Sequence, residues 1–200
     1  MLVVHGRSGG GVPMELQTLA ADLQQRRQAP VVLQALTASQ PPSHDSLGSG
    51  LRTLVPLMVL PGAHVRHDLP SIAGHWRLGG PIRRVPFVGA WPLWQRALAA
   101  ELGQDGPALV LHHPLQGPLA ERYLHHLAAV TRSTLLSASY SDPNSTSELA
   151  ARIRDHQGPV LALALAANRL TDSLGSLVGP PLLQRPRFYR VLLEQLEALP

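Results

Sequence analysis

The sequence of 200 residues contains no cysteine, and this absence narrows the chemistry open to the chain. Without thiols there are no disulfides, no thiolate metal ligands and no cysteine nucleophile, so imidazole and carboxylate groups are the strong metal ligands that remain. The chain has 10 histidines and 13 acidic residues. Metal or proton chemistry is therefore expected at histidine, aspartate or glutamate.

Lysine is absent and aromatic residues are scarce. All 17 basic residues are arginine, no basic run exceeds two residues, and only 4% of residues are aromatic. Nucleic-acid binding uses basic patches interleaved with aromatic side chains, so we expect no nucleic-acid partner and rank a basic RNA-binding domain third among the hypotheses. The arginines are either solvated, which is the commoner case, or bind a partner rich in carboxylates or phosphates.

Long apolar runs are missing as well. The longest, VLALALAA at 160–167, is far shorter than the roughly 20 residues that a membrane-spanning helix needs. No basic leader precedes an apolar segment at the N-terminus. We therefore expect no membrane segment and a cytoplasmic protein. Hydrophobic residues make up 44% of the chain, which is enough for a packed core in one domain or two small lobes.

Two histidines follow apolar segments that have the pattern of buried strands. One segment covers 2–4 and leads into His5, and the other covers 54–60 and ends shortly before His64. The carboxyl ends of parallel strands share one edge of a sheet, and this edge commonly binds ligands. If the two strands are neighbours, about 4.8 Å apart, the two imidazoles can converge on one small species.

Other segments have the spacing of helices and shorter strands. An edge strand is expected in 85–88 and a second inner strand over 31–36. We expect the helix after His64 to begin at Asp68, an N-cap residue followed by a proline in the first turn. The remaining helices are expected at 14–28, near 46–52 and at 92–102.

The second half of the chain repeats the order of these segments. This predicts an α/β fold of two similar lobes, each a small parallel sheet flanked by helices on both faces. The lobes are expected at 1–104 and 105–200, joined through a linker at 103–107. The matching segments are 108–113, 135–141, 163–172 and 186–196, which follow the patterns of 1–6, 31–37, 59–68 and 92–102.

The repeat also distinguishes the two lobes chemically. His112 corresponds to His5, but Asn168 takes the place of His64, while Asp172 corresponds to Asp68. The first lobe is therefore expected to hold the chemistry, and the second to be a degenerate copy.

At these residues the chain resembles the sirohydrochlorin chelatases, which insert Co(II) or Fe(II) into a tetrapyrrole without ATP. The family pattern is a first strand running into His-Gly-Ser and a later Pro-Gly-x-His-Val-x-x-Asp-Ile-Pro segment. Here these read VVHGRSGG at 3–10 and LPGAHVRHDLP at 60–70. The resemblance covers roughly the first half of the chain. It implies that His5 and His64 bind the substrate metal, Co²⁺ or Fe²⁺, and act as catalytic bases toward a tetrapyrrole substrate.

Two positions depart from the family pattern. Arg7 stands where the family usually has serine, and Thr37, which cannot act as a base, falls where the family has a glutamate. His44 and Asp45 are the candidates to replace that glutamate. Two hypotheses follow. The first is a lyase that metallates sirohydrochlorin or a related tetrapyrrole in siroheme or cobalamin biosynthesis, and the second is a non-catalytic descendant that binds tetrapyrrole or metal.

The glycine-rich turn at 7–11 resembles an anion-binding loop, because successive backbone amides precede a helix. It lacks the lysine and spacing of a P-loop and the fingerprint of a dinucleotide-binding turn, so we expect no ATP and no NAD. A carboxylate of the substrate is the expected ligand. The residues that we expect to contact substrate are Arg7, Ser8, Gly9, Arg66 and His67. The sequence leaves the oligomeric state open.

Overall fold

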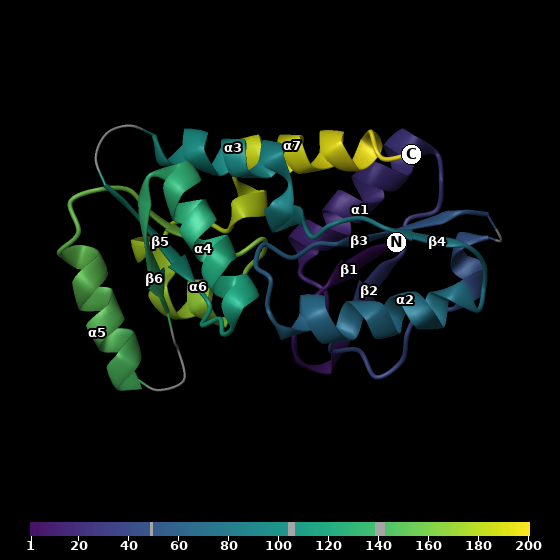
Figure 1. Ribbon diagram of the computed structural model, residues 1–200, viewed down its shortest axis with the longest axis horizontal. Helices are drawn as coiled ribbons and strands as arrows, with labels where there is room; N and C mark the ends of the chain where they lie inside the picture. The colour runs from purple at the N-terminus through teal and green to yellow at the C-terminus, as the bar shows by residue number, and fades with distance from the viewer. Residues whose placement is uncertain (49, 104–106, 139–142) are drawn as a thin grey trace. The chain divides into compact units, whose positions relative to one another are not determined.

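The computed structural model describes residues 1–48, 50–103, 107–138 and 143–200 and contains two parallel sheets (Figure 1). The predicted linker at 103–107 and the predicted match at 135–141 lie partly outside the described residues. The chain divides into two compact units, of which the first comprises Met1–Trp91 and Tyr189–Pro200 and the second Pro92–Phe188. Each unit holds one sheet, so the predicted α/β fold with two similar lobes is confirmed.

The sheet of the first unit has the strand order β2-β1-β3-β4, and its strands run parallel. Leu2 of β1 lies opposite Val55 of β3, so the two strands that precede His5 and His64 are neighbours. Their carboxyl ends therefore reach the same edge of the sheet. The strands are β1 (Leu2–Val4), β2 (Leu33–Ala35), β3 (Arg52–Pro56) and β4 (Ile82–Arg84).

Three elements lie at other positions than predicted. β3 begins at Arg52 because Arg52 and Thr53 pair with β4, and it ends at Pro56 instead of continuing to residue 60. The edge strand β4 precedes the predicted range 85–88, in which a proline lacks the N–H that a ladder requires. The helix expected near 46–52 is a short 3₁₀ turn at His44–Leu47.

Helices α1 (Met14–Arg27) and α2 (Leu69–Arg77) lie on opposite sides of this sheet (Figure 1). The indole of Trp76 on α2 is fully buried, and its Nε1–H donates a hydrogen bond to Oε1 of Gln34 over 2.6 Å. This bond ties α2 to β2. The buried residues of the α2 side are Met1, Val3, Leu54, Leu69, Ala73 and Trp76.

The compact units and the predicted lobes assign two helices differently. Helix α3 (Pro92–Leu102) packs against α4 (Pro118–Thr131) in the second unit, whereas most of α7 (Pro186–Glu197) belongs to the first. Helix α7 is tied to α1, because the Tyr189 hydroxyl donates to Oδ2 of Asp22 over 2.6 Å. Arg26 and Glu197 add an ion pair of 3.0 Å. The predicted boundary between lobes 1–104 and 105–200 therefore stays a prediction about the sequence repeat. The compact units are divided elsewhere, after Trp91 and after Phe188.

Tyr189→Phe is expected to lower the free energy of unfolding by about 1 kcal/mol, because it removes a hydrogen bond to a partly exposed carboxylate. Burial, together with the hydrogen bond and charge of Asp22, raises the pKa of the Tyr189 hydroxyl from 10.0 to about 12. Since the folded pKa is the higher one, the contribution is complete below pH 10 and is lost as the pH rises through about 12.

Urea unfolding of the wild type and Tyr189→Phe across this pH range checks the expectation. The difference in stability should be constant below pH 10 and should shrink above it. Asp22→Asn serves as the control, because it weakens the same bond and should add little to Tyr189→Phe in the double variant. A difference that is absent at pH 7, or that stays unchanged through pH 12, contradicts the expectation.

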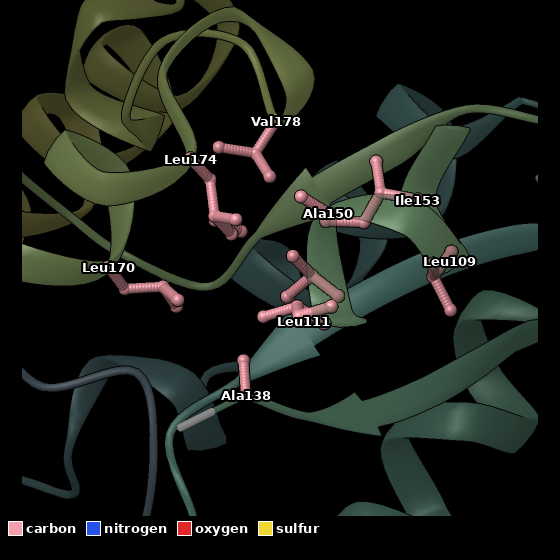
Figure 2. Close-up of a cluster of buried hydrophobic side chains, with 10 residues drawn as sticks. Leu109, Leu111, Ala138, Ala150, Ile153, Leu170, Leu174 and Val178 are labelled. Atoms are coloured by element: carbon pink, nitrogen blue, oxygen red, sulfur yellow. The ribbon is translucent and has the colours of Figure 1, made fainter. Parts of the chain in front are cut away.

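The sheet of the second unit has the order β6-β5-β7, which repeats the order β2-β1-β3. Its parallel strands are β5 (Ala108–His112), β6 (Ser133–Ser137) and β7 (Val160–Ala162). Apolar residues of α5 (Pro143–Arg154) and α6 (Arg169–Leu174) meet side chains of β5 in one buried cluster (Figure 2). The cluster consists of Leu109, Leu111, Ala138, Leu149, Ala150, Ile153, Ala162, Leu170, Leu174 and Val178.

Within the described ranges, no helix combines the length and the apolar character that crossing a bilayer requires. The longest described helices, α1 and α4, have 14 residues each. A helix of that length rises about 21 Å, which is shorter than the hydrocarbon core of a bilayer.

Candidate functional site

His5 and His64 meet at the carboxyl edge of the first sheet. His5 directly follows β1, and His64 begins the π-helical turn His64–Asp68 that follows β3. Their ring centroids lie 4.8 Å apart, and the ring planes are inclined by 77°. Two imidazoles that share one ion through bonds of about 2.1 Å come within a similar distance, about 5 Å. The predicted convergence of the rings is confirmed, and their roles in metal binding and catalysis stay predictions.

Each of the two rings uses its Nδ1 atom within the protein. Nδ1 of His5 lies 2.9 Å from the carbonyl oxygen of Gly6, and Nδ1 of His64 lies 2.5 Å from Oδ2 of Asp68. A ring that donates its N–H from Nδ1 carries its lone pair on Nε2. The site therefore offers two Nε2 atoms, one from each histidine, to a metal ion or a proton.

The histidine pair is open to solvent and has few neighbouring ligands. His5 is exposed, and the side chain of His64 is 44% exposed. Among the residues that the structure describes, no group of three or more histidines, aspartates and glutamates is arranged to hold a metal. Two protein ligands leave most positions of an ion open, which suits ligand exchange, whereas structural sites are closed by four protein ligands.

Asp68 does not cap a helix as predicted. The backbone is helical from Ala63 onward, about one turn before α2, so Asp68 lies inside the helical segment and makes no capping bond. Its carboxylate instead accepts the hydrogen bond from His64. Side chains four residues apart share one face of a helix, so the spacing within LPGAHVRHDLP is the signal that identifies this pair.

The glycine-rich turn after His5 is held by bonds among its own residues. The Arg7 N–H donates to the Gly11 carbonyl over 2.6 Å, and the Gly10 N–H donates to the Arg7 carbonyl over 3.1 Å. These two amides are not available to an anion, which corrects the expectation of a continuous run of loop amides. The predicted substrate-binding residues are exposed and their role stays a prediction: Arg7, Ser8, Gly9, Arg66 and His67.

Thr37, at the predicted place of the family glutamate, ties the end of β2 to the loop after β1. Its Oγ1–H donates to the Arg7 carbonyl over 2.6 Å, and its N–H donates to the His5 carbonyl over 3.3 Å. Thr37 therefore anchors the backbone on both sides of Gly6. It supports the position of His5 and supplies no base.

Gly6→Ala is expected to destabilise the first unit by about 1–2 kcal/mol, the cost of placing an L-residue in a left-handed conformation. Gly6 has φ of +79°, and an added Cβ would lie 2.5 Å from Oγ1 of Thr37 and 2.8 Å from Cβ of Ala35. Chemical unfolding measures the loss. Gly11→Ala is the matched control, because its Cβ would meet its nearest neighbour, in Arg7, at 3.8 Å. Equal stabilities of the two variants contradict the expectation.

His44 lies at the opposite edge of the sheet. Its ring packs on His75 near the end of α2 with centroids 4.4 Å apart, and 5.3 Å from the ring of Trp76. These rings lie beside the buried Arg52 at the start of β3, whose guanidinium donates to backbone carbonyls. The expectation that His44 or Asp45 replaces the glutamate is therefore wrong, because the chain returns along the sheet before it reaches them.

The second unit keeps half of the histidine arrangement. His112 ends β5, and its Nδ1 lies 2.9 Å from the carbonyl oxygen of His113, as His5 lies against Gly6. Asn168, which corresponds to His64, instead caps α6 by accepting the Thr171 N–H over 3.1 Å. The second unit thus keeps a counterpart of His5 in His112, which is only 5% exposed, and has a capping asparagine in place of His64.

The fold is similar to that of two solved structures. SirB from Bacillus subtilis with Fe³⁺ has a TM-score of 0.69 at 15% identity, covering 98% of this chain and 94% of that chain. The sirohydrochlorin chelatase SirB from Bacillus subtilis subspecies spizizenii in complex with cobalt has a TM-score of 0.65 at 15% identity, covering 98% and 92%. No protein-family model and no curated protein sequence matches the chain. The resemblance that the two motifs predict is confirmed at the level of the fold.

Proposed function

We propose that the protein inserts a divalent metal ion, Co²⁺ or Fe²⁺, into sirohydrochlorin or a related tetrapyrrole. The observation that carries the proposal is the meeting of His5 and His64 at one sheet edge, with 4.8 Å between their ring centroids. The similarity of the fold to a sirohydrochlorin chelatase in complex with cobalt supports it. The reaction would serve siroheme or cobalamin biosynthesis in the cytoplasm, and the proposal includes no step with ATP or NAD.

Metal insertion exchanges two pyrrole N–H protons for one divalent ion. The ion loses its other ligands as the macrocycle nitrogens replace them, and a base accepts each proton. An imidazole nitrogen can do either task, because its lone pair binds Co²⁺ or Fe²⁺ and accepts protons near neutral pH. In this proposal Nε2 of His5 and Nε2 of His64 hold the ion, and each nitrogen accepts a proton once the ion has moved into the ring.

The carboxylates of the substrate need cationic partners. Guanidinium groups bind carboxylates through two parallel hydrogen bonds. Arg7 and Arg66 are exposed, the first in the loop after His5 and the second two residues after His64. We assign these two arginines to the substrate carboxylates, with Ser8, Gly9 and His67 as further contacts.

A second candidate function is binding of a tetrapyrrole or a metal without catalysis. It is favoured by Thr37, whose hydroxyl is bonded to the Arg7 carbonyl where the resemblance places a glutamate. A site without that carboxylate has one base fewer for the pyrrole protons.

Metalation of sirohydrochlorin by the purified full chain separates the two functions. Absorbance is followed with Co²⁺ and with Fe²⁺, beside reactions without protein. The chelatase predicts a rate above the spontaneous one with at least one ion. A spontaneous rate accompanied by saturable binding of tetrapyrrole or metal supports the binding protein, and the absence of both overturns both functions.

A further inference from the structure

We propose that Asp68 is a positioning residue that makes the two histidines unequal, so that His64 is the stronger ligand of the substrate metal and His5 the weaker. The inference rests on the proposed function, because it concerns the same metal site. It assigns a role to a carboxylate that lies behind the ligands and outside the set of residues that contact the metal.

The two imidazoles are held by different acceptors. Nδ1 of His64 lies 2.5 Å from the Asp68 carboxylate, whereas Nδ1 of His5 lies 2.9 Å from the backbone carbonyl of Gly6. Hydrogen bonds to an ionised acceptor are shorter and roughly twice as strong as those to a neutral one. His64 is therefore oriented more firmly, and a negative charge stands directly behind its ring.

A carboxylate behind a metal-binding histidine has two effects. It fixes the tautomer that keeps the lone pair on Nε2, and it makes that nitrogen a better electron donor to the metal. Removing such a partner typically lowers metal affinity about 10–100-fold. The carbonyl of Gly6 also fixes the tautomer of His5, but it carries no net charge. Thr37 adds no charge to the site, whereas the Asp68 carboxylate contacts the ring of His64 directly.

The helical geometry explains why this contact forms. The chain turns into a π-helical segment at His64, and the N–H of Leu69 donates to the carbonyl of His64. The side chains of His64 and Asp68, four residues apart, then lie on one face. The Asp68 side chain is 47% exposed, so the carboxylate reaches the ring without being sealed from solvent.

The second unit provides a matched control. Asp172 corresponds to Asp68 in the sequence repeat and is exposed. Asn168 stands at the place of His64, and its side chain is used to cap α6. Asp172→Asn therefore makes the same chemical change at the corresponding position, where no imidazole stands four residues before the carboxylate.

The experiment titrates the full chain with Co²⁺ alone, without tetrapyrrole. Asp68→Asn is expected to weaken Co²⁺ binding about 10–100-fold and to shift the visible absorption of the bound ion, whereas Asp172→Asn leaves both unchanged. His64→Ala should weaken binding more than His5→Ala. NMR of the ring nitrogens in the metal-free chain supplies a second readout. Asp68→Ala should release His64 from the Nδ1–H tautomer, whereas the tautomer would stay unchanged if Asp68 only supported the fold.

Each outcome decides a different point. If the wild type binds no Co²⁺, the proposed function fails. If the wild type binds Co²⁺ but Asp68→Asn binds it equally well, or if His5→Ala causes the larger loss, the inference fails while the proposed function stands. A His64 tautomer that is unchanged in Asp68→Ala also overturns the inference. Circular dichroism of each variant shows whether the fold is retained.

Discussion

Alanine at position 64, or at position 5, is expected to lower the rate of metal insertion about 100-fold or more, the scale of losing a group that accepts protons in the reaction. His5 and His64 supply the two Nε2 atoms of the site, so neither can replace the other. The loss should be seen with both Co²⁺ and Fe²⁺, because the same imidazoles serve either ion. Initial rates of sirohydrochlorin metalation, corrected for the spontaneous reaction, measure it.

His125→Ala is the control for this prediction. His125 is exposed on α4 of the second unit, and its replacement also removes one imidazole from the chain. Its insertion rate should equal that of the wild type. An unchanged rate in either His5→Ala or His64→Ala contradicts the prediction.

Trp76→Ala should have the largest effect on stability, with a loss of about 3–5 kcal/mol in the free energy of unfolding. The indole is fully buried between α2 and the sheet, so its removal leaves a cavity. The side chain of Gln34, only 8% exposed, would also lose the partner of its amide oxygen. A buried polar group without a partner adds to the cost. Urea unfolding followed by circular dichroism measures the change.

Leu78→Ala is the matched control for Trp76→Ala. Leu78 lies two residues after Trp76, directly after the last residue of α2, but it is 81% exposed. Its truncation should change stability by less than about 0.5 kcal/mol, as for most surface substitutions. Similar losses in the two variants would contradict the prediction, because they would show that burial of the side chain does not set the loss of stability.

The part of the fold that sequence could predict is the part that depends on local pattern. The apolar segment at Leu2–Val4 and the spacing of α1 and α3 indicate their structure without knowledge of the rest of the chain. The position of β3 depends on a distant partner, since Arg52 and Thr53 become strand residues by pairing with β4. The sequence of the segment alone does not reveal this pairing. The predicted strand at 54–60 therefore differs from the observed β3.

The candidate site shows the same division. The pairing of His5 with His64 could be predicted from two strand ends and a motif, because β1 and β3 are neighbours in the sheet. The role of Asp68 could not, because an aspartate before a proline is typical of a helix start, and only the earlier onset of the helix turns it toward His64. The position of His44 beside His75 could not be predicted either, because it depends on the path of the loop that precedes β3.

The second unit explains how one chain carries two similar sheets and one candidate site. Its strand order repeats that of β2-β1-β3, and His112 keeps the hydrogen bond of His5 to the next carbonyl. The two units differ after the third strand of each repeat, where the capping Asn168 replaces an imidazole. The two units therefore share a strand order, although the pair formed by His5 and His64 lies in the first unit.

Cobalt X-ray absorption spectroscopy counts the imidazoles around the bound ion, and so shows whether His5 and His64 bind it together. With less than one equivalent of Co²⁺, we expect two imidazole ligands in the wild type and one in either His5→Ala or His64→Ala. The His125→Ala control should retain two. A spectrum that is the same in the wild type and in both variants would contradict the claim that His5 and His64 hold the ion between them.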